Sequence, residues 1–200
     1  VKLGCFSSVC TNRLPDIMRS FQKKYPDIEI EVFQGTYDDV VYWLKNGVVD
    51  LGFLSTSSAK DLPIEPLWRD PLLCIVPKGM KKEKDTDYMD IEEIRNHQFV
   101  TQRESTDADI QNFLKENSIN IQSNYHVVDD LSTVAMVANG FGICLMPQMV
   151  MRDIPYEVDC YPVQPYAERV IGLATLHPEF MAPAVRSMYN HILENYKEDF

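Results

Sequence analysis

Strand-like and helix-like segments alternate along this chain of 200 residues, and the alternation limits the folds that it can adopt. An apolar run predicts a strand at residues 1–6, and apolar residues at helical spacing predict a helix at 14–25. A period-two strand is predicted at 28–33, a helix around 40–48 and a buried strand at 49–54. Short connections between such segments favour a parallel sheet that is covered by helices.

The same alternation returns in the second half of the chain. Two apolar runs, 64–68 and 72–76, are separated by an Asp-Pro turn, and an exposed lysine-rich loop is predicted at 78–87. Strands are then predicted at 98–101, 121–128, 143–146 and 168–176, with helices at 107–117, 131–139 and 185–196. The predicted fold class is α/β with two Rossmann-like lobes. We expect residues 1–76 and 170–200 in lobe I and residues 77–169 in lobe II.

Composition argues against several kinds of partner and site. The formal net charge of −11 disfavours direct binding to nucleic acid or to an anionic membrane surface. No apolar run approaches the roughly 20 residues that span a bilayer. The five cysteines are scattered without CxxC spacing, and the four histidines are dispersed. We therefore expect no disulfide framework, no metal site and no cofactor, in a protein of the reducing cytoplasm.

Small polar residues follow one predicted strand after another, at the ends where open α/β sheets collect ligands. Hydroxyls beside the free N–H groups of helix starts can hold a carboxylate or another small anion. A single such junction is more often a helix cap, but several together favour a binding site. The candidate ligand-binding residues are Ser7, Ser8, Thr36, Ser55, Thr101, Gln102, Arg103, Asp129 and Leu131.

The chain contains no catalytic motif that we can name. GxSxG, HExxH and Walker lysine patterns are absent, and Gly140-Phe141-Gly142 lacks the third glycine of a dinucleotide turn. Cys10, near a helix start, could act as a redox thiol. The spacing indicates no second cysteine to resolve it, so we interpret Cys10 as an ordinary packed residue. No catalytic residue is assigned, and we do not expect an enzyme.

Four stretches together resemble the effector-binding domain of LysR-type transcriptional regulators. The first runs from "VKLGCFSSVCTNRLPD" through a helix that closes at Tyr-Pro, a Gly-Thr turn and Asp-Leu-Gly. The others are "DPLLCIVPKG", "DDLSTVAMVANGFGICLMPQMV" and "IGLATLHPEFMAPAVRSMYNHI". The resemblance covers nearly the whole chain and lies in the order of the motifs.

The resemblance implies a fold like that of type 2 periplasmic binding proteins, with two crossover strands and a ligand in the cleft between the lobes. It further implies a small-molecule effector, a homodimer or tetramer, and transcriptional control through a winged helix-turn-helix before Val1 that contacts DNA. Ser7 and Ser8 would then serve both as helix cap and as floor of the ligand site.

Two other functions remain open at this point. One is a secreted solute-binding protein of the same fold, although the odd number of cysteines and the short chain argue against it. The other is a small enzyme on this scaffold, such as a dehydratase, although no acid-base pair can be named for it.

Overall fold

The computed structural model describes residues 1–102, 108–121 and 123–199. The chain divides into two compact units: unit 1 contains residues 1–69 and 170–200, and unit 2 contains residues 70–169. Strands β4 (Ile64–Pro77) and β10 (Glu168–Ala174) contain the two boundaries between the units. The boundary predicted after residue 76 falls in the same strand as the observed one.

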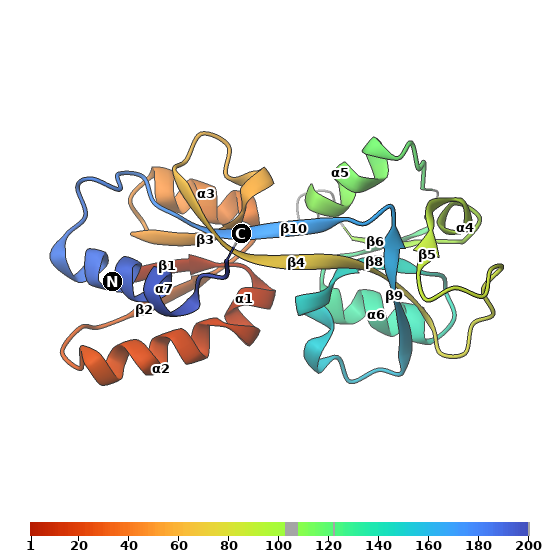
Figure 1. Ribbon diagram of the computed structural model, residues 1–200, viewed down its shortest axis with the longest axis horizontal. Helices are drawn as coiled ribbons and strands as arrows, with labels where there is room; N and C mark the ends of the chain where they lie inside the picture. Colours follow the sequence, from red (N-terminus) through yellow and green to blue (C-terminus); the bar gives the residue numbers. More distant parts are fainter. Residues whose placement is uncertain (103–107, 122, 200) are drawn as a thin grey trace. The chain divides into compact units, whose positions relative to one another are not determined.

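The sheet of unit 1 is built around β1 (Lys2–Cys5), which is parallel both to β2 (Glu31–Gln34) and to β3 (Leu51–Ser55). β10 returns antiparallel to β3 (Figure 1). The predicted α/β fold class and the parallel pairing are confirmed. Because these three strands are parallel, their carboxyl ends meet at one edge of the sheet, where ligands of such sheets collect.

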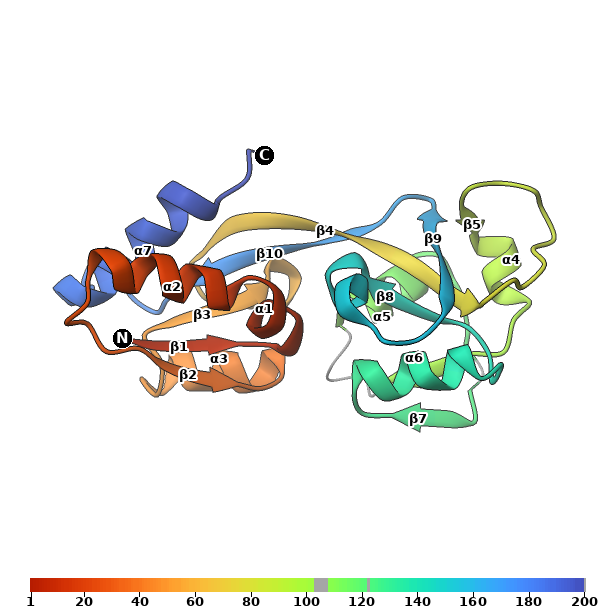
Figure 2. The same ribbon diagram turned by 90° about the horizontal axis from the view of Figure 1, so that it is seen from below.

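Four helices cover this sheet: α1 (Ser7–Asn12), α2 (Leu14–Lys24), α3 (Tyr37–Lys45) and α7 (Pro183–Tyr196). α3 packs on β1 and β3, while α2 and α7 pack on each other at the opposite face (Figures 1 and 2). Gly52 allows α3 to approach closely, because a Cβ there would lie 2.7 Å from Val40 Cγ1 and 2.8 Å from Leu44 Cδ1.

The opposite face of the sheet buries the apolar stripe of α2. Leu14, Ile17 and Phe21 recur at spacings of three and four residues and are almost completely buried. Burial of each such side chain contributes about 1.5–3 kcal/mol. Trp68 of β4 stacks on Phe53 and donates its indole N–H to the Tyr196 carbonyl oxygen at 2.6 Å. The C-terminal helix is therefore held by its packing on α2 and by a partly buried hydrogen bond.

In unit 2, β8 (Cys144–Pro147) and β9 (Val158–Gln164) both run antiparallel to β4. β5 (Met89–Asp90) is parallel to β9, and β6 (Val100–Gln102) is parallel to β7 (Tyr125–Val127). The helices are α4 (Ile91–Arg95), α5 (Ala108–Glu116) and α6 (Asp130–Ala138), with 3-10 turns η1 (Thr56–Ser58, in unit 1) and η3 (Gln148–Asp153). Phe99, Phe113 and Leu145 belong to its core.

Two local predictions are wrong. The Asp70-Pro71 pair does not make a turn, because β4 continues through it as one strand of 14 residues. Pro71 is tolerated since the pairs of β4 with β8 and β9 begin only at Leu72 and Leu73. Residues 7–12 form helix α1 where a turn was predicted.

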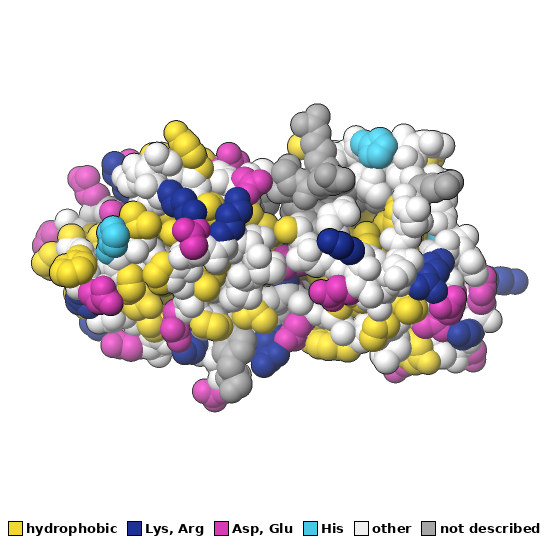
Figure 3. Space-filling view, turned by 90° about the horizontal axis from the view of Figure 1, so that it is seen from above, with side chains coloured by type: hydrophobic (Ala, Val, Ile, Leu, Met, Phe, Trp, Pro, Cys, Tyr) yellow, Lys and Arg dark blue, Asp and Glu magenta, His cyan; other side chains and the backbone are white. Residues whose placement is uncertain are grey.

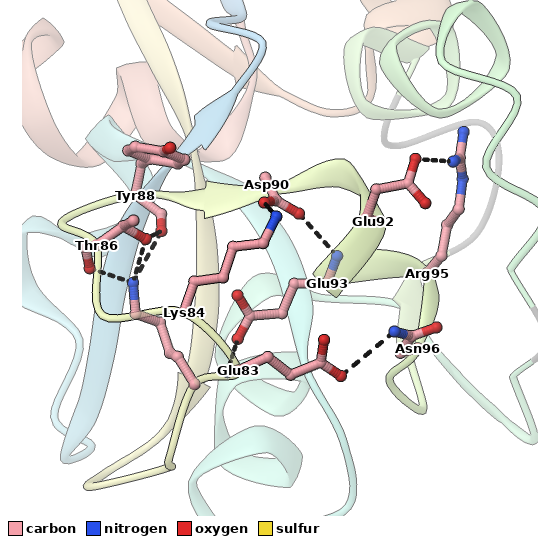
Figure 4. Close-up of polar contacts among 10 residues, drawn as sticks. Glu83, Lys84, Thr86, Tyr88, Asp90, Glu92, Glu93, Arg95 and Asn96 are labelled. Carbon is pink, nitrogen blue, oxygen red and sulfur yellow. Dashed lines mark hydrogen bonds and ion pairs between the residues drawn. The ribbon is translucent and has the colours of Figure 1, made fainter.

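The lysine-rich loop at 78–87 is exposed at most positions, as predicted, but it is tied back to unit 2. The Lys82 ammonium donates to both the hydroxyl and the carbonyl of Thr86 and to the Tyr88 carbonyl, and it lies 4.3 Å from the centroid of the Tyr161 ring. Buried Glu93 accepts the backbone N–H of Glu83 at 2.7 Å (Figure 4). These contacts hold the loop against unit 2, although its lysine-rich composition predicts a solvated segment.

Candidate functional site

The first candidate residues, Ser7 and Ser8, lie in the opening turn of α1, directly after β1. The N-cap residue of α1 is Phe6, and the N-cap makes no side-chain hydrogen bond. The expectation that these serines cap a helix is therefore wrong, because helix α1 begins at Ser7 itself. Ser7 is exposed, and its Oγ accepts a hydrogen bond from Gln34 Nε2 at 3.0 Å. Since Gln34 ends β2, this bond joins the carboxyl ends of two adjacent strands.

Ser55 is the last residue of β3, and its side chain is fully buried. Its Oγ lies 3.0 Å from the Oγ of Ser57, which is exposed. Because β3 neighbours β1 in the sheet, these hydroxyls stand at the same edge as the Ser7–Gln34 pair. Hydroxyl and amide groups thus follow all three parallel strands of unit 1.

Thr36 is the N-cap of α3 and forms a reciprocal capping box with Asp39. Its hydroxyl accepts the Asp39 N–H at 3.2 Å and donates to Asp39 Oδ2 at 2.8 Å, and the same oxygen accepts the Thr36 N–H at 2.8 Å. The Asp39 carboxylate therefore already lies at the N-terminus of α3, and its negative charge disfavours the binding of a second anion there. A ligand contact by Thr36 stays a prediction.

In unit 2, Thr101 lies within β6. Its hydroxyl donates to the Tyr125 carbonyl oxygen at 3.2 Å and lies 3.3 Å from His126 Nδ1, so Thr101 links β6 to β7. Gln102 is the last residue of β6. Arg103, which was also predicted to bind ligand, lies outside the described residues.

Asp129 is the N-cap of α6 and accepts both the N–H and the hydroxyl of Ser132 at 2.8 Å. The backbone N–H of Ser132, and after it the Ser132 hydroxyl, lower the pKa of Asp129, because both bonds favour the charged carboxylate. Leu131, in the first turn of the same helix, is 46% exposed. Asp129 therefore works as a cap, and ligand contacts by these two residues stay predictions.

Residue patterns missed two members of the polar edge of unit 1, which consists of Ser7, Gln34, Ser55 and Ser57. Gln34 and Ser57 belong to it, and their positions shortly after predicted strands were the available signal. Within residues 1–102, 108–121 and 123–199, no group of three or more His, Cys, Asp or Glu side chains is placed to hold a metal ion.

Several curated proteins are similar in sequence to this chain. The chain is 25% identical over 189 residues to YoaU, an uncharacterized HTH-type transcriptional regulator of Bacillus subtilis, with 92% of this chain and 63% of YoaU covered. It is 26% identical over 205 residues to YybE, another such regulator of that organism, with 99% of this chain and 68% of YybE covered. The chain thus spans less than two thirds of YoaU.

Solved structures share the fold. The effector binding domain of QuiR in complex with shikimate matches with a TM-score of 0.85 and 22% identity, covering 98% of this chain and 96% of that one. The regulatory domain of Synechocystis PCC6803 CcmR in complex with 2-PG matches with a TM-score of 0.87 and 16% identity, covering 99% and 97%. The family model described as the LysR substrate binding domain matches residues 1–197. This chain therefore belongs to the LysR substrate-binding domain family.

Proposed function

We propose that this chain is the ligand-sensing domain of a cytoplasmic LysR-type transcription regulator, and that it binds a small carboxylate. The observation that carries the proposal is the set of neutral polar side chains at the carboxyl ends of three neighbouring parallel strands. The set consists of Ser7, Gln34, Ser55 and Ser57. Buried Ser8 lies beside it in the chain.

These groups can recognise a carboxylate by hydrogen bonding. Hydroxyl and amide N–H donors need only small rotations to turn from each other to an incoming anion. Each such bond to a charged group contributes about 1.5–3 kcal/mol. The acidic Asp39 at the start of α3 limits the anion to the β1 and β3 side of this edge. The residues predicted in unit 2, Thr101 and Gln102 among them, stay predictions.

The relatives support a regulatory role. YoaU and YybE are named as transcriptional regulators, and the QuiR and BenM domains were solved with shikimate and benzoate, which are both carboxylates. DNA contact is assigned to a part of the regulator that this chain does not include. In agreement, the chain has a formal net charge of −11, and on the face in Figure 3 the Lys and Arg side chains lie among Asp and Glu side chains.

The proposed mechanism is a population shift. An effector that binds one conformation of the domain more tightly raises the population of that conformation. Within the described residues, none of the helices combines the length and the apolar character that a membrane span needs.

The regulator is expected to be a homodimer or tetramer, so the shift in population would alter how its DNA-binding parts are presented. Light scattering at tens of micromolar tests the oligomeric state, and a strictly monomeric regulator would contradict this part of the proposal.

A thermal-shift screen tests the binding function. Benzoate, shikimate and a set of aliphatic carboxylates are compared with the corresponding amides, which have similar shapes but no charge. A true effector at 100 times its dissociation constant adds about 2.7 kcal/mol to the free energy of unfolding. We expect a saturable rise in melting temperature for at least one carboxylate and none for its amide. Equal shifts with acid and amide would contradict recognition of the carboxylate group.

A further inference from the structure

An open groove lies at one edge of unit 2, at the end where three of its strands begin. His97 and Gln98 stand just before β6, residues 140–143 stand just before β8, and Tyr125 is the first residue of β7. β6 is parallel to β7, and an isolated parallel bridge joins the segments that lead into β6 and β8. The groove has a volume of about 500 Å³, which is typical of small-molecule sites.

The residues predicted to bind an effector in unit 2 lie at the other end of the same elements. Gln102 is the last residue of β6, whereas Gln98 precedes its start. Asp129 caps the start of α6, whereas residues 140–143 follow its end. α6 has nine residues, which span about 14 Å at the rise of an α-helix. The groove is therefore a different place in unit 2 from the predicted effector residues.

The turn after α6 holds an aromatic ring in the lining of the groove. Gly140, with φ 81°, donates its N–H to the Val137 carbonyl oxygen at 2.9 Å. The next residue, Phe141, donates its N–H to the Met136 carbonyl oxygen at 3.2 Å, which completes a Schellman motif. The Phe141 ring lies edge-on to Tyr125, with the centroids 5.6 Å apart, and it is still 44% exposed. A partly exposed ring on a backbone held in this way offers a firm surface to the ring of a ligand.

His97 brings an unsatisfied polar atom to the lining. Its Nε2 is buried and has no hydrogen-bond partner in the part of the chain that the structure describes. A buried polar atom without a partner costs free energy, and a ligand group that bonds to it removes that cost. Because a neutral imidazole can hold its proton on either nitrogen, Nε2 can donate or accept, and a hydroxyl group can answer either role. His97 therefore favours a ligand with a hydroxyl group.

The rest of the lining is apolar or neutral. Pro77, Met80 and Ile143 add apolar surface, and among the described residues that line the groove none is Asp, Glu, Lys or Arg. A methionine sulfur makes favourable contacts with aromatic rings. An ionic ligand would lose hydration here without gaining an opposite charge. The groove therefore fits an uncharged aromatic molecule better than a carboxylate, in contrast to the polar edge of unit 1.

We propose that this groove is a second small-molecule site of the chain and that it binds an uncharged aromatic molecule with a hydroxyl group, of the phenol class. The ring of the ligand packs against Phe141 and Met80, and its hydroxyl group bonds to His97 Nε2. Gln98, which follows His97 in the chain and is exposed, offers an amide to a second polar substituent. The site does not depend on carboxylate binding in unit 1, so either proposal can fail alone.

Fluorine NMR tests the site with three matched probes. The probes are para-fluorophenol, para-fluoroanisole, in which a methyl group caps the oxygen, and para-fluorobenzoate, which carries a charge. The fluorine signal of each probe is followed as the chain is added, and its shift gives the dissociation constant. We expect para-fluorophenol to bind saturably and para-fluoroanisole to bind about two- to twelvefold more weakly, as the loss of one neutral hydrogen bond predicts.

The third probe separates this site from the polar edge of unit 1. We expect an excess of para-fluorobenzoate to leave the binding of para-fluorophenol unchanged, because the groove offers no cation to a carboxylate. Competition between these two probes would place them in one site and overturn the proposal. It is also overturned if para-fluorophenol shows no saturable binding or binds no more tightly than para-fluoroanisole.

Variants assign the binding to the groove. Phe141→Ala removes the ring and should weaken para-fluorophenol binding about tenfold. The control Phe180→Ala removes a ring of unit 1 that is 83% exposed and should leave the binding unchanged. His97→Leu should abolish the preference for para-fluorophenol over para-fluoroanisole, whereas a mere loss of packing would weaken both probes equally. Unchanged binding in Phe141→Ala, or a preserved preference in His97→Leu, overturns the assignment.

Discussion

Asp70 and Arg169 form the most deeply buried ion pair in the described part of the chain, with side-chain exposures of 3% and 6%. Arg169 donates through Nε at 2.8 Å and Nη2 at 2.7 Å to one carboxylate oxygen, and the other oxygen accepts the Met149 N–H at 2.8 Å. Arg169→Met leaves a buried carboxylate without its cation and should reduce the free energy of unfolding by about 3–5 kcal/mol. Urea denaturation measures the change.

A matched control uses an exposed ion pair. Arg19 and Asp16 lie one turn apart on α2, 2.9 Å from each other, and both are 68% exposed. Arg19→Met should change stability by no more than about 1 kcal/mol. If the two arginine variants lose the same stability, burial does not determine the contribution of the Asp70–Arg169 pair.

His191 makes stability depend on pH. Burial, followed by the charge of Lys24, lowers its pKa below the usual value of about 6.5, while Glu194 opposes the shift. Its Nε2 lies 2.8 Å from Ser20 Oγ, and Asn195 and Tyr196 also face the ring. The unfolded chain therefore takes up a proton at higher pH than the folded chain, and stability falls as pH falls through about 6.5.

The predicted change is measured by urea denaturation at pH 7.5 and pH 5.5. His191→Asn should lose less stability between these values than the unsubstituted chain does. His177→Asn, which alters an exposed histidine, should keep the original dependence. An unchanged slope in His191→Asn would show that other groups cause the loss.

Prediction from sequence succeeded for single residues where the determinant is local. Thr36 and Asp129 were predicted at junctions between a strand and a helix, and each proves to be an N-cap that bonds to a residue three positions away. The Asp70–Arg169 pair joins residues 99 positions apart, so no local pattern reveals it.

At the scale of elements, the start of α3 depends on the Thr36–Asp39 capping box. Thr36→Ala removes the hydroxyl that accepts the Asp39 N–H and should cost about 0.5–2 kcal/mol of stability. Thr36→Ser keeps the oxygen and should cost less. Thermal denaturation of both variants decides the point, and equal losses would mean that the methyl group rather than the cap contributes the stability.

The elements that were predicted well are those with a strong period. α2 shows its stripe of Leu14, Ile17 and Phe21 directly in the sequence. β9 and β5 were not predicted, because β9 contains Pro162, which disfavours a strand, and β5 contains only two residues. β4 was divided at Pro71, where proline chemistry favours a break but the sheet leaves room for it.

At the scale of the molecule, the order of strands and helices was sufficient to predict an α/β fold. The parallel pairing of β1 with β2 and β3 follows from connections that each contain a helix. The strand order around β10 could not be predicted in the same way, because β10 pairs with β3 from a distance of more than 100 residues. The sequence predicted that polar residues follow the strands of unit 1, because strand ends can be located from the apolar runs. It did not predict the individual hydrogen bonds of the polar edge.

The proposed function requires that hydroxyls at the carboxyl ends of β1 and β3 bind a small carboxylate. Titration calorimetry with the carboxylate selected by the thermal screen compares the unsubstituted chain with Ser7→Ala, Ser55→Ala and the control Ser187→Ala, whose hydroxyl donates to the Pro183 carbonyl oxygen within α7. We predict that each site variant raises the dissociation constant about ten- to a hundredfold and that the control leaves it unchanged. Dissociation constants equal to that of the unsubstituted chain in both site variants would contradict carboxylate binding at this edge of unit 1.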